Sequence, residues 1–294
     1  MKKVIHLTTY NDYRGDFQSL FMLYNEVISC NEDIEFNFSK CNFLRPNAVA
    51  FIGGLARLIE QNQRAVTFDW HSVKNDAVMA NLCQNGFANS FNHTSSGWDG
   101  NSIPYREDPV NDMNGVMDYL TFNWIGKGWV QVSDPLKDAI VGRMWEIYSN
   151  AFEHSETPIG VFSCGQLFRR HNRLILSTVD FGKGIPCSVR DFLVKKGVDP
   201  EKVSRLSSGV CLNWAFTRGN TTCNAMVARG LGLDLLKEFF QVNQGKLEIY
   251  SNDGYAIVDK DGERFENCNI NFSGTIVHIT LCCDETIYRF GNEV

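Results

Sequence analysis

The sequence predicts an α+β protein in which a small α/β domain precedes an α/β sandwich. Two features carry this prediction. In the first third of the chain, short apolar runs of strand length alternate with segments whose apolar residues recur at helical spacing. In the second half, helices and antiparallel strands occur in separate runs, which is typical of a sheet with helices on one face. With 294 residues, 44% of them apolar, the chain is long enough to fill such cores.

The first third predicts strands and helices in alternation. Pro46 stands where a helix would begin, because proline is favoured at the first helical position. Gly86 ends the last apolar pattern. The predicted strands are 4–7, 34–38 and 65–70, and the predicted helices are 17–28, 46–59 and 75–84.

The stretch 92–115 is crowded with Asn, Ser, Gly, Asp and Pro and shows little periodicity, so it predicts a boundary. Trp98 and Tyr105 indicate that this segment is docked, since isolated large aromatic residues are usually buried. The predicted division is an α/β domain over 1–90, a connecting segment over 91–133 and a second domain over 134–294.

The second domain opens with a helix predicted over 135–154. Two apolar strands follow, joined by the turn-forming sequence 169–173. The region 188–229 reads as helical and irregular. The predicted strands are 159–168, 174–179, 246–251, 255–258 and 275–281, and a further helix is predicted over 231–240.

Composition narrows the possible partners. The net charge is −6 and the sequence has no long Lys/Arg run, so nucleic acid is not expected as a direct partner. The N-terminus lacks an apolar stretch of signal-peptide length, and no later stretch approaches a membrane span. We therefore expect a cytoplasmic protein with no membrane partner. The ten cysteines include no C-x-x-C pair, so they are expected as small buried residues and not as zinc ligands.

Three polar residues, Glu146, Asn150 and His154, recur at intervals of four on the helix predicted for 135–154. This spacing places them along one helix face. A solvated polar stripe on an ordinary amphipathic helix is the alternative explanation.

An Asp-x-Gly-x-Gly motif, formed by Asp180, Gly182 and Gly184, follows the apolar strand 174–179. It would place a carboxylate and bare backbone at the rim of a sheet. A simple tight turn explains the same residues, because Asp and Gly are common in turns.

Two further motifs lie towards the C-terminus. Arg229, Gly230, Leu231 and Gly232 open the second predicted helix of this domain. Glycines let backbone approach a ligand closely, and the free N–H groups of a helix start attract anions such as phosphate. Thr275 enters a late strand after a glycine, where it could donate to a phosphate or serve only as a strand residue.

In this order, the four motifs resemble those of the GHKL ATPases. That superfamily includes type II topoisomerases, heat-shock chaperones, histidine kinases, mismatch-repair proteins and the bacterial anti-sigma-factor kinases, and the last branch is the most similar. The resemblance covers about 134–294. It implies a Bergerat-type ATP-binding fold with an ATP lid over 187–229, and ATP and Mg²⁺ as ligands.

The resemblance also implies a role for each motif residue. Asn150 would bind magnesium, Asp180 would accept a hydrogen bond from the adenine amino group, and Glu146 would be the general base. The remaining predicted nucleotide contacts are Gly182, Gly184, Gly230, Leu231 and Gly232 around the nucleotide and its phosphates, Thr275 at the adenine end, and Arg218 and Arg229 as candidate phosphate contacts.

The segment 34–70 resembles the STAS-like domains of anti-sigma-factor antagonists. Those domains carry a phosphorylated serine at the start of a helix, but 42–48 holds no serine or threonine, and Ser39 lies on the wrong side of the turn. The resemblance therefore implies a docking or regulatory surface and not a phosphoacceptor.

Three functions fit these expectations. The favoured one is an ATP-dependent regulatory switch with slow or partner-dependent hydrolysis. The alternatives are an anti-sigma-type serine/threonine kinase acting on a partner protein, and a degenerate nucleotide fold that mediates assembly. A histidine kinase is disfavoured, because no helical hairpin with a phosphoacceptor histidine precedes 134. The sequence does not identify the partner protein, and a homodimer is possible by analogy with the family.

Overall fold

The structure is a computed structural model that describes residues 2–95, 98, 100–217 and 234–293. Its first part confirms the predicted alternation of strands and helices, with each element within a few residues of its predicted bounds. The elements are β1 (Lys2–His6), α1 (Arg14–Ile28), β2 (Asp33–Asn37), α2 (Pro46–Gln61), β3 (Val66–Asp69), a 3-10 turn (Trp70–Ser72), α3 (Asp76–Gln84) and α4 (Phe87–Ser90). The three strands form a parallel sheet in the order β1-β2-β3.

A second sheet holds seven antiparallel strands in the order β4-β5-β6-β10-β7-β8-β9. A mixed α+β fold with a large antiparallel sheet is thereby confirmed. Its strands are β4 (Ser102–Asp108), β5 (Val161–Phe168), β6 (Arg173–Asp180), β7 (Lys246–Ser251), β8 (Gly254–Asp259), β9 (Gly262–Asn267) and β10 (Thr275–Cys282). The edge strands β4 and β9 were not among the predicted strands, and β4 comes from the segment expected to be a connection.

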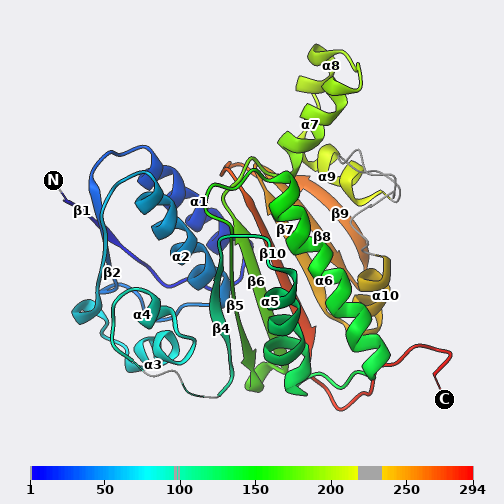
Figure 1. The fold of residues 1–294 in the computed structure, drawn as a ribbon, viewed down its shortest axis with the longest axis horizontal. Helices are drawn as coiled ribbons and strands as arrows, with labels where there is room; N and C mark the ends of the chain where they lie inside the picture. The colour runs from blue at the N-terminus through cyan, green and yellow to red at the C-terminus, as the bar shows by residue number, and fades with distance from the viewer. Residues whose placement is uncertain (1, 96–97, 99, 218–233, 294) are drawn as a thin grey trace.

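The remaining helices lie between these strands in the chain. They are α5 (Met113–Asp118), a π-helical turn (Tyr119–Trp124), a 3-10 turn (Ile125–Lys127), α6 (Asp134–His154), a 3-10 turn (Arg169–His171), α7 (Ile185–Lys195), α8 (Pro200–Ser204), α9 (Ser208–Phe216) and α10 (Asp234–Asn243). Figure 1 shows α6 running across one face of the large sheet. None of the helices in the described part of the chain combines the length and apolar character that a membrane span needs.

Both faces of the large sheet are buried, which corrects the expectation that helices cover only one. Successive side chains of a strand point to opposite faces. Along β10, Val277 and Ile279 belong to a buried cluster that includes residues of α6, α9 and α10, whereas Ile276 belongs to a cluster with α1 and α2. Helix α2 packs directly on β5 and β6. The N-terminal part and the back of the large sheet therefore share one core, while the predicted domain limits stay a prediction.

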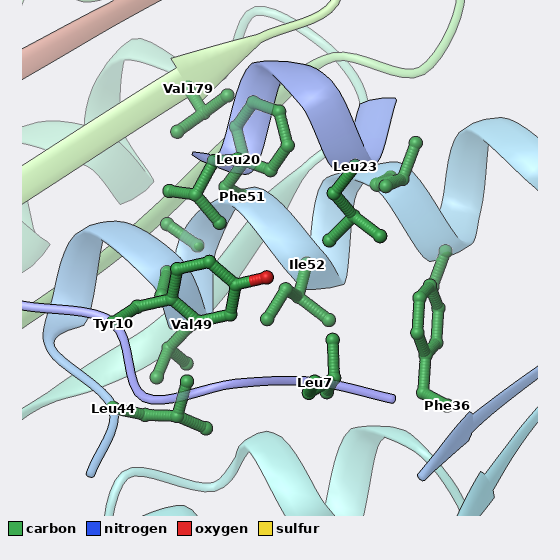
Figure 2. Close-up of a cluster of buried hydrophobic side chains, with 14 of the residues drawn as sticks. Leu7, Tyr10, Leu20, Leu23, Phe36, Leu44, Val49, Phe51, Ile52 and Val179 are labelled. Carbon is green, nitrogen blue, oxygen red and sulfur yellow. The ribbon is translucent and has the colours of Figure 1, made fainter. Parts of the chain in front are cut away.

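Two glycines let α2 approach the sheet closely. A Cβ atom at Gly54 would lie 2.4 Å from the Phe181 ring, and one at Gly53 would lie 2.2 Å from the Tyr105 hydroxyl. Figure 2 shows the buried cluster that results, in which Val179 of β6 joins side chains of α1 and α2 such as Leu20 and Phe51. The back of the sheet is a close-packed interior.

Candidate functional site

A pocket opens on the α6 face of the large sheet. It holds about 890 Å³ of empty space, counting the part open to solvent. Its floor comes from β5, β6, β7 and β10, and its walls from α6, α7 and α9. The lining residues are mostly apolar, with polar groups gathered where β6 ends.

The α6 wall carries two of the three predicted polar residues. Helix α6 begins after Ser133, whose hydroxyl accepts a hydrogen bond from the Leu136 N–H at 3.4 Å. Asn150 and His154 line the pocket near the other end of the helix. Glu146 does not line the pocket, and its carboxylate forms an ion pair with Arg143.

Three polar residues form a row on adjacent strands, and two of them, Asp180 and Thr275, line the pocket. Thr275 of β10 is paired in register with Asp180 of β6 on one side and with Ser251 of β7 on the other. The hydroxyl oxygens of Ser251 and Thr275 are 2.9 Å apart. The Ser251 hydroxyl also accepts a hydrogen bond from the Ile185 N–H at 2.8 Å, so the row is tied to the start of α7.

Asp180 is the most unusual group of the row, because only 4% of it is exposed. Burial raises the pKa of Asp180 to about 7, since removing water penalises the ionised carboxylate. Hydrogen bonds from the Gly182 N–H and from the Ser155 and Thr275 hydroxyls act in the opposite direction. A carboxyl group with such a pKa changes charge near neutral pH and is typical of functional sites.

The loop between β6 and α7 needs its glycines. A Cβ atom at Gly182 would lie 2.1 Å from the Ser155 carbonyl oxygen. Gly184 has a φ of +81°, which other residues rarely adopt, and its Cβ would lie 2.6 Å from the Asn252 side chain. Gly184 also lines the pocket, so the Asp-x-Gly-x-Gly motif brings bare backbone to the site as predicted.

The end of α6 meets this loop. The Ser155 carbonyl accepts a hydrogen bond from the Lys183 N–H at 2.6 Å, and the His154 carbonyl accepts one from the Ser188 hydroxyl at 3.0 Å. Burial lowers the pKa of His154, because removing water disfavours the charged ring. These contacts fix the distance between the α6 wall and Asp180.

The predicted site residues fall into three groups. The structure brings Asn150, Asp180, Gly184 and Thr275 together around one pocket. Gly182 supports it from the adjoining loop, and Glu146 stands one helical turn before Asn150. The other predicted residues lie outside the described part of the chain: Arg218, Arg229, Gly230, Leu231 and Gly232.

The sequence did not predict Ser155 and Trp214, which line the pocket, or Ser251, which lies within hydrogen-bond distance of Thr275. Ser251 reaches the row only through the strand register, which local patterns do not reveal. Ser155 directly follows the helix stripe, so its position was a usable signal. Trp214 lines the pocket from α9, within the predicted lid.

Within the described ranges, no group of three or more His, Cys, Asp or Glu side chains is placed to hold a metal ion. The side-chain amide of Asn150 borders the pocket and makes no hydrogen bond to another described residue. An amide oxygen of this kind suits a hard cation such as Mg²⁺ when phosphate supplies further oxygen ligands.

No protein-family model matches the sequence, and a search of curated proteins finds no relative.

Proposed function

We propose that the pocket binds ATP with Mg²⁺, and that the chain is a regulatory ATP-binding protein of the GHKL type with a Bergerat-type fold. The observation that carries the proposal is the buried carboxyl group of Asp180 at the end of an apolar pocket. A flat base that presents an amino group would fill such a pocket and donate to this acceptor. The hydrogen-bonded hydroxyls of Thr275 and Ser251 keep the acceptor row in place.

The α6 wall supports the magnesium part of the proposal. Asn150 presents an amide oxygen that no described residue occupies, on a helix fixed to the Asp180 loop at its C-terminal end. The bound ion would neutralise part of the negative charge of the phosphates. The side chain of Asn150 would hold the ion at the rim, and Asp180 would orient the base.

Slow or partner-dependent hydrolysis follows from the place of Glu146. Its carboxylate is engaged by Arg143 on the same helix, and it lies outside the pocket lining. A general base must reach the proton that it accepts. Glu146 would therefore act only after its carboxylate moves into the pocket, which suits a switch better than a rapid enzyme.

The test compares Asp180→Asn with the wild-type chain. Wild type is expected to show a thermal shift with magnesium–ATP, and calorimetry is expected to show that D180N loses affinity by roughly 10- to 100-fold, because a charge-assisted hydrogen bond is lost. Asp138→Asn is the matched control, since Asp138 is exposed on α6 and far from the pocket lining. Equal ATP affinity in D180N and D138N would contradict the proposal.

A further inference from the structure

The pocket is flanked by two helices that stand over different strands of the sheet. Helix α6 packs on β5, and helix α9 packs on β8 and β9. The floor strands β6, β10 and β7 lie between β5 and β8 in the sheet order. The two helices therefore wall the pocket from opposite sides, and the space between them is a slot above β10.

The α9 wall of this slot carries an aromatic ring, that of Trp214. An α-helix turns by about 100° per residue, so Trp214 points roughly opposite to Leu212 and Phe216, which lie two residues away on either side. Leu212 and Phe216 are buried in the core, whereas Trp214 is only partly buried. The indole is thus not needed to fill the sheet core.

The ring is held in place by its surroundings. The Trp214 and Phe192 ring centroids are 5.5 Å apart, with the rings tilted by 45°. Helix α9 is anchored at its start, where the Gly209 N–H donates to Asn267 Oδ1 at 2.8 Å and the Ser208 hydroxyl donates to Asp253. A fixed aromatic wall of this kind costs little entropy when a ligand binds.

We infer that Trp214 stacks on the base of the bound nucleotide and makes the pocket selective for ligands that carry an aromatic base. The inference rests on the proposed function and adds its specificity-determining residue. The opposite wall supplies aliphatic contacts such as Ile147, and the floor supplies Ile249, so a flat ring meets apolar surface on both sides. Asp180 reads the edge of the base, and Trp214 reads its face.

The experiment measures affinity for magnesium–ATP and for magnesium–tripolyphosphate by calorimetry in wild type, Trp214→Ala and Trp214→Phe. W214A is expected to lose roughly 5- to 100-fold in ATP affinity, as for other base–aromatic stacks, with tripolyphosphate affinity unchanged. W214F keeps an aromatic face and is expected to stay within about threefold of wild type for ATP. Trp98→Phe is the matched control, because Trp98 is 50% exposed and outside the pocket lining.

A second readout covers the case in which W214A folds poorly. Indole fluorescence is expected to fall when ATP saturates wild type or W98F, and to change little in W214F. An equal ATP affinity in W214A and wild type, or an equal loss for ATP and tripolyphosphate, would overturn the inference while the proposed function stands. A wild-type chain that binds no nucleotide would instead overturn the proposed function, and this inference with it.

Discussion

Buried polar groups have different surroundings on the two faces of the large sheet. On the α6 face, Asp180 borders a pocket and receives hydrogen bonds from its own loop and from neighbouring hydroxyls. On the other face, His278 of β10 is fully buried beneath α1. Its Nδ1 atom lies 2.7 Å from the Ser177 hydroxyl, but its Nε2 atom has no hydrogen-bond partner among the described residues and lies 4.0 Å from the Asp12 carboxylate.

The same physical effect shifts the two groups in opposite directions. Burial raises the pKa of Asp180 to about 7 and lowers the pKa of His278 to about 4, because each group avoids its charged form. Two further buried polar atoms on the His278 face, the Tyr250 hydroxyl and Thr280 Oγ1, also have no hydrogen-bond partner in the part of the chain that the structure describes. Ordered water is the ordinary partner of such atoms in a closed core. Asp180 adjoins the pocket and His278 does not, so of the two buried groups only Asp180 supports the proposed ligand site.

The largest expected effect is a loss of stability from a substitution in the packed back face of the sheet, away from the pocket. Phe21 is fully buried on α1, and its ring stacks on Phe272 with centroids 4.4 Å apart. Phe21→Ala is expected to lower the free energy of unfolding by about 3–5 kcal/mol, because it leaves a cavity in the core. Denaturant titration measures this loss, and calorimetry on the folded protein should find ATP affinity within about threefold of wild type.

Phe21→Leu is the matched variant, because it keeps most of the apolar volume. It is expected to restore most of the lost stability. A loss of ATP affinity in Phe21→Ala that exceeds tenfold would show that the two faces are not independent.

The next prediction compares how the stability contributions of Asp180 and His278 depend on pH. The Asp180 pKa rises from 3.8 to about 7 on folding, so the folded state binds more protons between these values and stability falls as pH rises through them. The His278 pKa falls from 6.5 to about 4, so stability is present above 6.5 and is lost as pH falls towards 4. At about 1.4 kcal/mol for each pH unit, the contribution is at most about 4.5 kcal/mol for Asp180 and about 3.5 kcal/mol for His278.

Neutral variants separate the two contributions. Measured by urea denaturation from pH 4.5 to 8, Asp180→Asn is expected to gain stability relative to wild type as pH rises. His278→Asn is expected to gain stability relative to wild type as pH falls. If both differences change with pH in the same direction, the opposite pKa shifts are wrong.

Local sequence patterns predict the pocket face of the sheet better than the back face. Asp180 and Gly184 were found because local motifs report turn chemistry and helix faces. The row that completes the site depends on the register of Thr275 with Ser251, which is set by pairing between distant strands. The strand β4 was missed because its segment is rich in turn residues, and pairing with β5 overrides that local preference.

The sequence also indicates that the back face of the sheet is buried. The run 174–179 carries apolar residues at both odd and even positions, as strands buried on both faces do. Gly53 and Gly54 were predicted only as part of a helix, because their role depends on how closely α2 approaches Tyr105 at Gly53 and Phe181 at Gly54. Contacts between elements far apart in the chain are invisible to local patterns.

The smallest expected effect on stability is that of a substitution at Glu146. This substitution also tests whether ATP binding and ATP hydrolysis depend on different residues. The ion pair with Arg143 is partly exposed, so Glu146→Gln is expected to change the free energy of unfolding by less than about 0.5 kcal/mol. ATP affinity should also stay within about twofold, because Glu146 does not line the pocket. Hydrolysis, measured as phosphate release, is expected to fall by about 100-fold or more if Glu146 is the base.

Arg143→Gln is the matched variant, because it breaks the same ion pair and leaves the carboxylate in place. It is expected to raise phosphate release by about twofold at most, because an exposed ion pair restrains the Glu146 carboxylate only weakly. A fall in turnover in E146Q that R143Q does not share, with equal ATP affinity, would assign the carboxylate to catalysis. Unchanged turnover in E146Q would remove Glu146 from the reaction and leave the pocket as a binding site alone.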